Sequence, residues 1–106
     1  KVAGGAKVNE PGVDLACGIA LVSSFLDVPV KADLVCFGEI GLSGEIRMVP
    51  QMDERIKEAL RLGFNQVMVP KRLVREVSSS NIIGVSTVEE AVRNALTKNT
   101  HIKQND

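Results

Sequence analysis

Three closely spaced glycines, Gly38, Gly41 and Gly44, are the feature that most constrains how this chain can fold. Glycine is used where φ must be positive or where another backbone comes close. The residues between them are too few for the crossover helix that joins parallel strands, so the flanking strands must pair antiparallel. After Gly44, polar and apolar residues alternate, and Glu45 and Arg47 share one face. The sequence therefore predicts a glycine-turned hairpin with one exposed side.

The second hairpin strand leads into an amphipathic helix. Ile46 and Met48 are expected on the buried face of that strand, and Pro50, which cannot donate to a strand ladder, ends it. Apolar positions then recur at helical spacing, at Met52, Ile56, Ala59, Leu60 and Gly63. Charged residues lie outside this apolar stripe. The pattern indicates a helix with one face on the core and the other in solvent.

The remaining segments alternate between strand and helix patterns. Strands are expected at residues 1–8, 34–37, 65–69 and 82–85, and helices from Pro11 to Phe25, at residues 71–77, and from a Thr87–Glu90 capping box onward. The first helix is apolar on nearly every side, which predicts a buried helix. The alternation predicts an α/β (α+β) domain with a mixed sheet. We expect one domain over residues 1–98, a fragment of a larger protein, and a frayed tail over residues 99–106.

Composition excludes several classes of function. The 106 residues carry 13 basic and 13 acidic side chains, so no net charge draws the chain to nucleic acid or to a membrane. No apolar run is long enough to cross a bilayer. Cys17 and Cys36 lack metal-site spacing and are expected to be reduced core residues, as in a cytosolic protein. Neither a metal nor another cofactor is expected in this domain.

The run from Phe37 to Arg47, Phe-Gly-Glu-Ile-Gly-Leu-Ser-Gly-Glu-Ile-Arg, together with the charged helix that follows, resembles the proteolytic domain of the Lon family. The amino-acid sequence of this run is closer still to that of the Lon-like domain of the RadA (Sms) family of bacterial DNA-repair proteins. The resemblance covers nearly the whole chain. It implies a Lon proteolytic-domain-like (ribosomal-protein domain 2-like) fold.

The resemblance also places the residues of a Ser-Lys dyad. Lon-type peptidases use a serine at the start of the first helix and a lysine in the helix after the hairpin. Here the gapless register puts Gly12 at the serine position and Arg55 at the lysine position. Glycine has no hydroxyl to attack a substrate, and arginine is not deprotonated in proteins, so it cannot act as a general base. The dyad is therefore degenerate, and this domain is expected not to be an enzyme.

Other serines and lysines offer a weaker alternative, namely Ser23, Ser24 and Ser43 with Lys31 and Lys57. Ser23 and Ser24 lie well inside the first helix, where hydroxyls usually bond back to the i−4 carbonyl. Lys57 lies on a polar helix face with Asp53 four residues earlier, and a solvated lysine is a poor base at neutral pH. A first-turn Asp14 is expected to cap its helix rather than to catalyse. For each of these residues, a structural role is favoured over a catalytic one.

A basic patch is the candidate for DNA contact. Lys71, Arg72 and Arg75 lie on the predicted third helix, and Arg61 lies on the helix before it. Such residues can hold phosphates, although three phenylalanines in apolar contexts provide no stacking platform for bases. The glycine spacing is not that of a nucleotide-binding loop. The resemblance implies that ATP and Mg²⁺ are used by an ATPase domain of the parent protein.

The function implied by the resemblance is that of an inactive scaffold. RadA-type proteins are ATP-driven hexamers that extend DNA branches in recombinational repair. We therefore expect a cytoplasmic domain that self-associates into a homo-hexameric ring beside the ATPase domain, with DNA as a further partner and no membrane contact. Two alternatives stay open: an active Ser-Lys peptidase that uses non-standard residues, and a generic partner-binding module.

Overall fold

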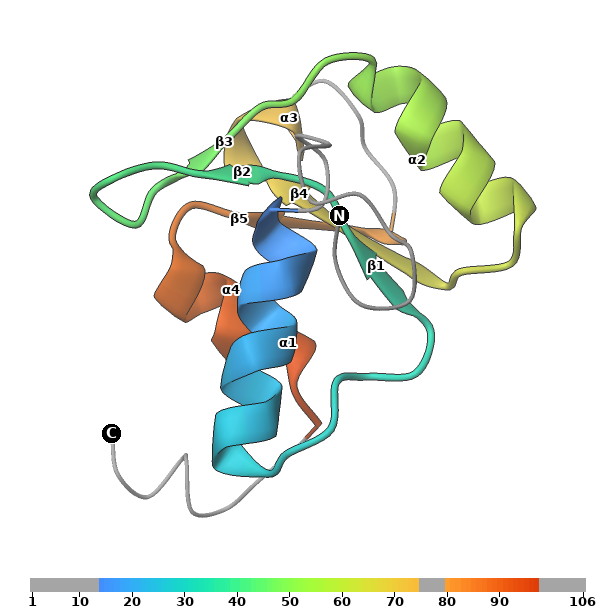
Figure 1. Ribbon diagram of the computed structural model, residues 1–106. Coiled ribbons are helices and arrows are strands. Elements are labelled where there is room, and N and C mark those ends of the chain that lie inside the picture. Colours follow the sequence, from blue (N-terminus) through green and yellow to red (C-terminus); the bar gives the residue numbers. More distant parts are fainter. Residues whose placement is uncertain (1–13, 75–79, 98–106) are drawn as a thin grey trace, which may run out of the picture.

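The computed structural model describes residues 14–74 and 80–97 (Figure 1). The predicted strand at residues 1–8, the Gly12 position, the end of the third helix with Arg75, and the tail lie outside the described residues. Within the described ranges the chain is of the α/β class, as the sequence predicts. No helix in these ranges has the length and apolar character needed to span a membrane.

A three-stranded parallel sheet forms the centre of the described structure. Its strands are β1 (Leu34–Cys36), β4 (Gln66–Pro70) and β5 (Ile82–Val85), in the order β1-β4-β5. Val67 of β4 is opposite Val35 of β1 and Ile82 of β5. Three consecutive β4 residues, Val67 to Val69, are fully buried, which confirms the predicted strand with two covered faces.

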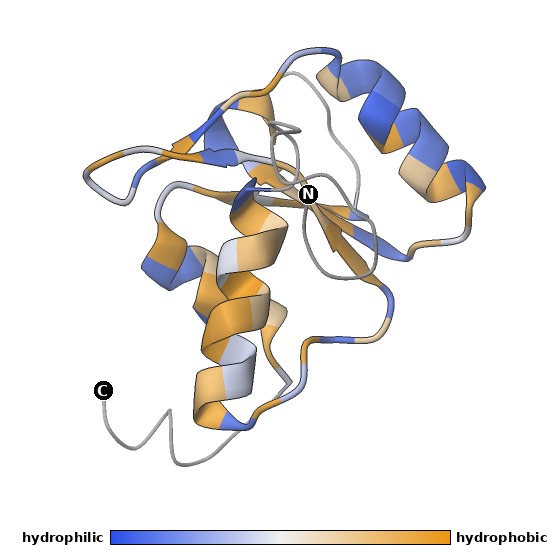
Figure 2. Cartoon of the chain, in the orientation of Figure 1, coloured by the Kyte–Doolittle hydropathy of each residue, from blue (hydrophilic) through white to orange (hydrophobic). Residues whose placement is uncertain are grey.

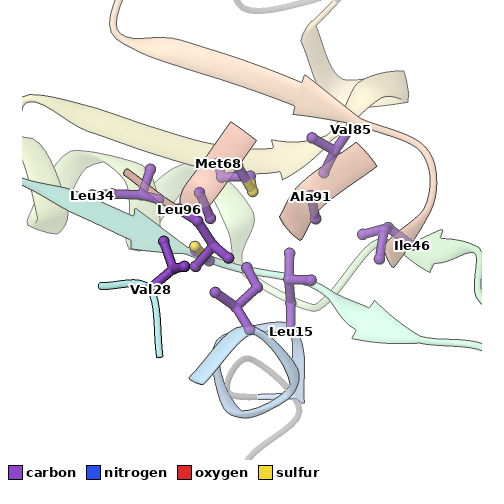
Figure 3. Close-up of a cluster of buried hydrophobic side chains, with 11 residues drawn as sticks. Leu15, Val28, Leu34, Ile46, Met68, Val85, Ala91 and Leu96 are labelled. Atoms are coloured by element: carbon purple, nitrogen blue, oxygen red, sulfur yellow. The ribbon is translucent and has the colours of Figure 1, made fainter. Parts of the chain in front are cut away.

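Helices cover both faces of this sheet (Figure 1). On one side lie α1 (Asp14–Leu26) and α4 (Val88–Ala95), and on the other α2 (Met52–Arg61) and the short α3 (Lys71–Val74). Because strand side chains alternate, Met68 points to the α1 side while Val67 and Val69 point to the α2 side. The buried side chains therefore form two hydrophobic cores, one on each side of the sheet. In the core on the α1 side, Figure 3 shows Leu15 of α1 directed toward Met68 and Val85.

The predicted glycine hairpin is confirmed. β2 (Glu39–Ile40) pairs antiparallel with β3 (Ile46–Arg47) in a separate two-stranded sheet, and Gly44 has the positive φ of 84° that favours glycine. The hairpin is attached to α4, because the Gly44 carbonyl accepts a hydrogen bond of 2.9 Å from the backbone N–H of Val88. The prediction that Met48 is buried was wrong, because Met48 is 39% exposed and Val49 is buried instead. The strand β3 ends at Arg47, so the alternation of buried and exposed residues stops there.

The helix ends follow the expected chemistry with one change. Both α1 and α2 end in a left-handed residue, Asp27 and Gly63, after which a backbone N–H bonds back to the last turn. Thr87 caps α4 by accepting a hydrogen bond from the backbone N–H of Glu90. The Glu90 carboxylate, however, accepts from the N–H of Ser86, one residue earlier than a regular capping box would use.

The prediction that α1 is buried on nearly every side was wrong. Leu15 and Ile19 are buried, but Leu21 is 73% and Phe25 is 88% exposed. Figure 2 shows apolar residues along much of α1, in contrast to α2. Cys17 lies on the exposed side of the same helix, so the expectation that it is a core residue was also wrong. Leu60 of α2, expected inward, is 39% exposed.

Candidate functional site

Two hollows open on the described surface, and each contains residues that the sequence singles out. The first lies between β1 and α2 and has a volume of about 480 Å³; we call it the α2 pocket. Its lining is mainly apolar and aromatic with a charged rim: Val35, Phe37, Gln51, Glu54, Arg55, Glu58, Ala59, Leu62 and Phe64. It contains Arg55, which the resemblance places at the position of the Lon-type lysine.

Arg55 is held in the wall of the α2 pocket. It lies one turn into α2, directly before the buried Ile56, and its Nε donates a hydrogen bond of 2.9 Å to the carbonyl of Pro50. Glu54 and Glu58 lie on the same rim. A guanidinium in this place supplies positive charge and hydrogen-bond donors, but no basic lone pair. Gly12, which the resemblance places at the serine position, lies outside the described residues.

The start of α1 is fixed against the glycine hairpin. The backbone N–H of Leu15 donates to the Gly38 carbonyl at 3.0 Å, and the Asp14 carboxylate accepts from the N–H of Ile40 at 3.2 Å. Asp14 therefore has a structural role, as predicted, but through a contact with β2. The Ser23 hydroxyl donates to the Val28 carbonyl, five residues onward, which corrects the expected i−4 bond.

The second hollow lies at the carboxyl ends of β4 and β5, the edge where parallel α/β sheets usually bind ligands. It has a volume of about 460 Å³ and joins β3, α3 and the turn before α4; we call it the basic hollow. Three cations and one hydroxyl surround a small apolar floor, the full lining being Ile46, Arg47, Met48, Pro70, Lys71, Arg72, Val85 and Ser86.

Two of these cations are paired with carboxylates at the rim. Arg47 contacts Glu45 at 2.7 Å, and Lys71 contacts Glu90 at 3.4 Å. The pKa of Glu90 is lowered, first by the hydrogen bond from the Ser86 N–H and then by Lys71. The pKa of Glu45 is lowered by hydrogen bonds from its own backbone N–H and from Arg47. Both carboxylates are thus anionic at neutral pH and neutralise part of the positive charge.

Arg72 is the third cation of the basic hollow, and it is exposed. It makes no ion pair with any residue that the structure describes. The hollow and its rim therefore hold three cations against two carboxylates, a surplus of one positive charge.

The structure brings together only part of the predicted basic patch. Lys71 and Arg72 share the basic hollow, whereas Arg61 lies at the far end of α2, away from α3 (Figure 1), and is paired with Glu58. Arg75 lies outside the described residues. Arg47 belongs to the hollow but was missed, because the sequence shows it merely as the exposed residue of a hairpin strand. Its place in the same hollow as α3 depends on tertiary structure.

Cysteine and metal chemistry add no further site to the described ranges. Burial raises the pKa of the Cys36 thiol to about 12, so this thiol stays protonated and unreactive at neutral pH. Among the residues that the structure describes, no group of three or more His, Cys, Asp or Glu side chains could hold a metal ion.

Comparison with protein families defines the class of this chain. Residues 3–72 match the family described as subunit ChlI of Mg-chelatase. The match extends from the predicted first strand to Arg72 and thus includes the glycine hairpin and α2. The chain therefore belongs to this family.

Individual proteins that are similar to this chain confirm its resemblance to RadA. The chain is 50% identical over 91 residues to the DNA repair protein RadA of Aquifex aeolicus, 39% over 102 residues to that of Listeria monocytogenes, and 41% over 99 residues to that of Bacillus subtilis. These alignments cover 86%, 91% and 91% of this chain, but 20%, 22% and 22% of the relatives. The chain spans about a fifth of the length of the curated relatives it matches.

Proposed function

We propose that this chain is a catalytically inactive, Lon-like scaffold domain of a RadA-type DNA-repair protein. The observation that carries the proposal is the alignment with RadA proteins over 86–91% of the chain, combined with arginine where Lon-type chemistry needs a titratable lysine. Arg55 lines the α2 pocket and bonds to the Pro50 carbonyl, so the pocket keeps its wall but lacks a general base at this position.

The scaffold role is supported by the exposed face of α1. Leu21 and Phe25 are among the most exposed large apolar side chains, and Cys17 continues their stripe one turn earlier. Contiguous apolar surface of this kind marks protein–protein contacts. In the proposed role the domain associates with further copies in a hexameric ring. The ATP and Mg²⁺ chemistry of this cytoplasmic protein belongs to an ATPase domain elsewhere in the parent.

Sedimentation tests the scaffold role. The wild-type chain should form larger species as its concentration rises, and a Leu21→Gln/Phe25→Gln variant should stay monomeric with an unchanged circular dichroism spectrum. Because exposed residues are replaced, stability should change by no more than about 0.5 kcal/mol. A wild-type chain that remains strictly monomeric at high concentration would count against the ring.

A covalent probe tests the absence of peptidase chemistry. A fluorophosphonate reagent reacts with activated serines, and intact mass spectrometry detects one adduct per modified chain. We expect no adduct on this chain under conditions that fully label an active serine peptidase. An adduct on Ser23, Ser24 or Ser43 would favour the alternative of a peptidase with non-standard residues.

A further inference from the structure

We propose that the α2 pocket receives the side chains of Leu21 and Phe25 from α1 of a second copy of this chain. The contact is head-to-tail, because the two copies contribute different surfaces to it. The inference rests on the proposed function, in which α1 carries the self-association, and deepens it by naming the surface on which α1 docks. Arg55, in the wall of the pocket, then takes part in a contact between copies.

The aromatic side chains of this chain lie on these two surfaces. The sequence has three phenylalanines and neither tyrosine nor tryptophan. Phe37 and Phe64 line the α2 pocket and are only partly buried, whereas Phe25 of α1 is 88% exposed. Leu21, one turn before Phe25, is 73% exposed. Aromatic anchors that fill pockets contribute much of the binding energy at protein interfaces, and paired aromatic rings attract each other beyond the area they bury.

The two surfaces can meet only between copies. α1 packs on one side of the central sheet, and α2 with its pocket lies on the other (Figure 1). Within one copy the sheet therefore separates them. A surface and its complement on opposite sides of a molecule form a heterologous contact, which closes into a ring or extends as a filament when it is repeated. A two-fold contact between two α1 helices would instead stop at a dimer and leave the pocket unfilled.

The charges of the two surfaces are complementary. Asp27 directly follows α1, and the last turn of the helix has no basic residue, so this end carries negative charge from the side chain and from the helix dipole. Arg55 places positive charge in the pocket wall. Of the two carboxylates on the rim, Glu58 is paired with Arg61, and Glu54 lies in the first turn of α2, where the helix dipole offsets its charge.

A mixing experiment tests the pairing of the two surfaces. Phe25→Gln removes the anchor, and Leu62→Glu places a charge in the pocket lining at a residue that is 61% exposed and therefore tolerant of substitution. Each variant alone should stay monomeric in sedimentation velocity at concentrations where the wild type associates. An equimolar mixture should form dimers and nothing larger, because α1 of the Leu62→Glu chain still fits the intact pocket of the Phe25→Gln chain.

Leu42→Glu is the matched control for the pocket variant. Leu42 is a fully exposed leucine between the hairpin strands and lies outside both surfaces, so this variant should associate like the wild type. Asp27→Asn tests the charge at the end of α1, since asparagine also tolerates the positive φ of 58° at this position. It should weaken association by up to roughly fivefold, the range of an exposed ion pair.

The outcomes separate this pairing from the proposed function. If the wild type and Leu62→Glu associate equally while Phe25→Gln does not, or if the mixture forms no dimer, the pocket is not the docking surface and the self-association of the proposed function stands. If the wild type is monomeric at every concentration, that self-association fails.

Disulfide trapping then decides whether a weaker contact exists. Phe25→Cys and Leu62→Cys chains, both carrying Cys17→Ser, are mixed under mild oxidation, and the buried Cys36 thiol, whose pKa is raised to about 12, does not compete. Disulfides that form between the two variants in preference to either variant with itself would retain the pairing. No such preference would overturn it.

Discussion

The two hollows differ in what lies beneath them. The α2 pocket rests on the core on that side of the sheet: Ala59 lines it and is buried, and Ile56 lies directly below in the same helix. The basic hollow instead carries its functional groups on exposed side chains at the ends of strands. The α2 pocket, which contains Arg55, is therefore maintained by packing, whereas the cations of the basic hollow are exposed to solvent and do not contribute to the core.

The largest expected effect is a loss of stability, caused by a substitution that disrupts the packing beneath the α2 pocket. Ile56→Ala removes a side chain that is 5% exposed, and substitutions of this kind destabilise by about 2–5 kcal/mol because they leave a cavity. Leu62→Ala is the matched control, since Leu62 lines the same pocket but is 61% exposed, and it should change stability by about 0.5 kcal/mol or less. Urea unfolding followed by circular dichroism measures both. Equal effects would contradict the assigned packing.

The second-largest expected effect comes from Gly84, where α3, which lines the basic hollow, packs closely on β5. A Cβ added at Gly84 of β5 would lie 2.9 Å from the Lys71 Cα and 2.5 Å from a methyl carbon of Val74. Gly84→Ala should therefore shift α3 and lower the free energy of unfolding by about 1–3 kcal/mol, measured by urea unfolding.

Gly18→Ala is the control for this substitution. Its added Cβ meets the flexible end of Ile40 at 3.0 Å, and alanine favours a helix over glycine by about 1 kcal/mol. Gly18→Ala should be neutral or stabilising in the same measurement. If both variants fold with wild-type stability, α3 does not pack on β5 as described.

The smallest effect concerns acid stability at the rim of the hollow. The folded-state pKa of Glu90 is lowered from the ordinary value of 4.5 by the Ser86 N–H and Lys71. Its stabilising contribution is therefore fully present above the unfolded-state pKa and is lost as the pH falls through the lowered folded-state pKa.

Glu90→Gln should reduce the loss of unfolding free energy between pH 7 and pH 3. Glu89→Gln, which removes a charge from the same turn without removing either contact, should leave this loss unchanged. Urea titrations at the two pH values provide the measurement. An identical acid sensitivity in wild type and Glu90→Gln would show that the carboxylate makes no net contribution.

Local patterns predicted the elements that depend on local chemistry. The glycine spacing gave the hairpin, the apolar run from Val67 to Val69 gave the central strand, and Thr87 gave the start of α4. The hairpin depends on turn geometry, the central strand on the burial of consecutive residues, and the helix start on a cap. A few adjacent residues determine each of these features.

Properties that depend on distant contacts could not be read in the same way. The apolar pattern of α1 could not show that Leu21 and Phe25 lack cover among the described residues, because that depends on which surfaces meet. Likewise, Arg47 is 24 residues before Lys71, and no local pattern indicates that β3 and the start of α3 line the same hollow.

The most direct test of the central claim is an NMR titration of the chain with a short DNA duplex. We expect amide shifts to concentrate around the basic hollow, at Lys71, Arg72 and Ser86, and to leave Val35 and Phe64 of the α2 pocket unchanged. Shifts centred on the α2 pocket, with the hollow unaffected, would contradict the division of roles between the two.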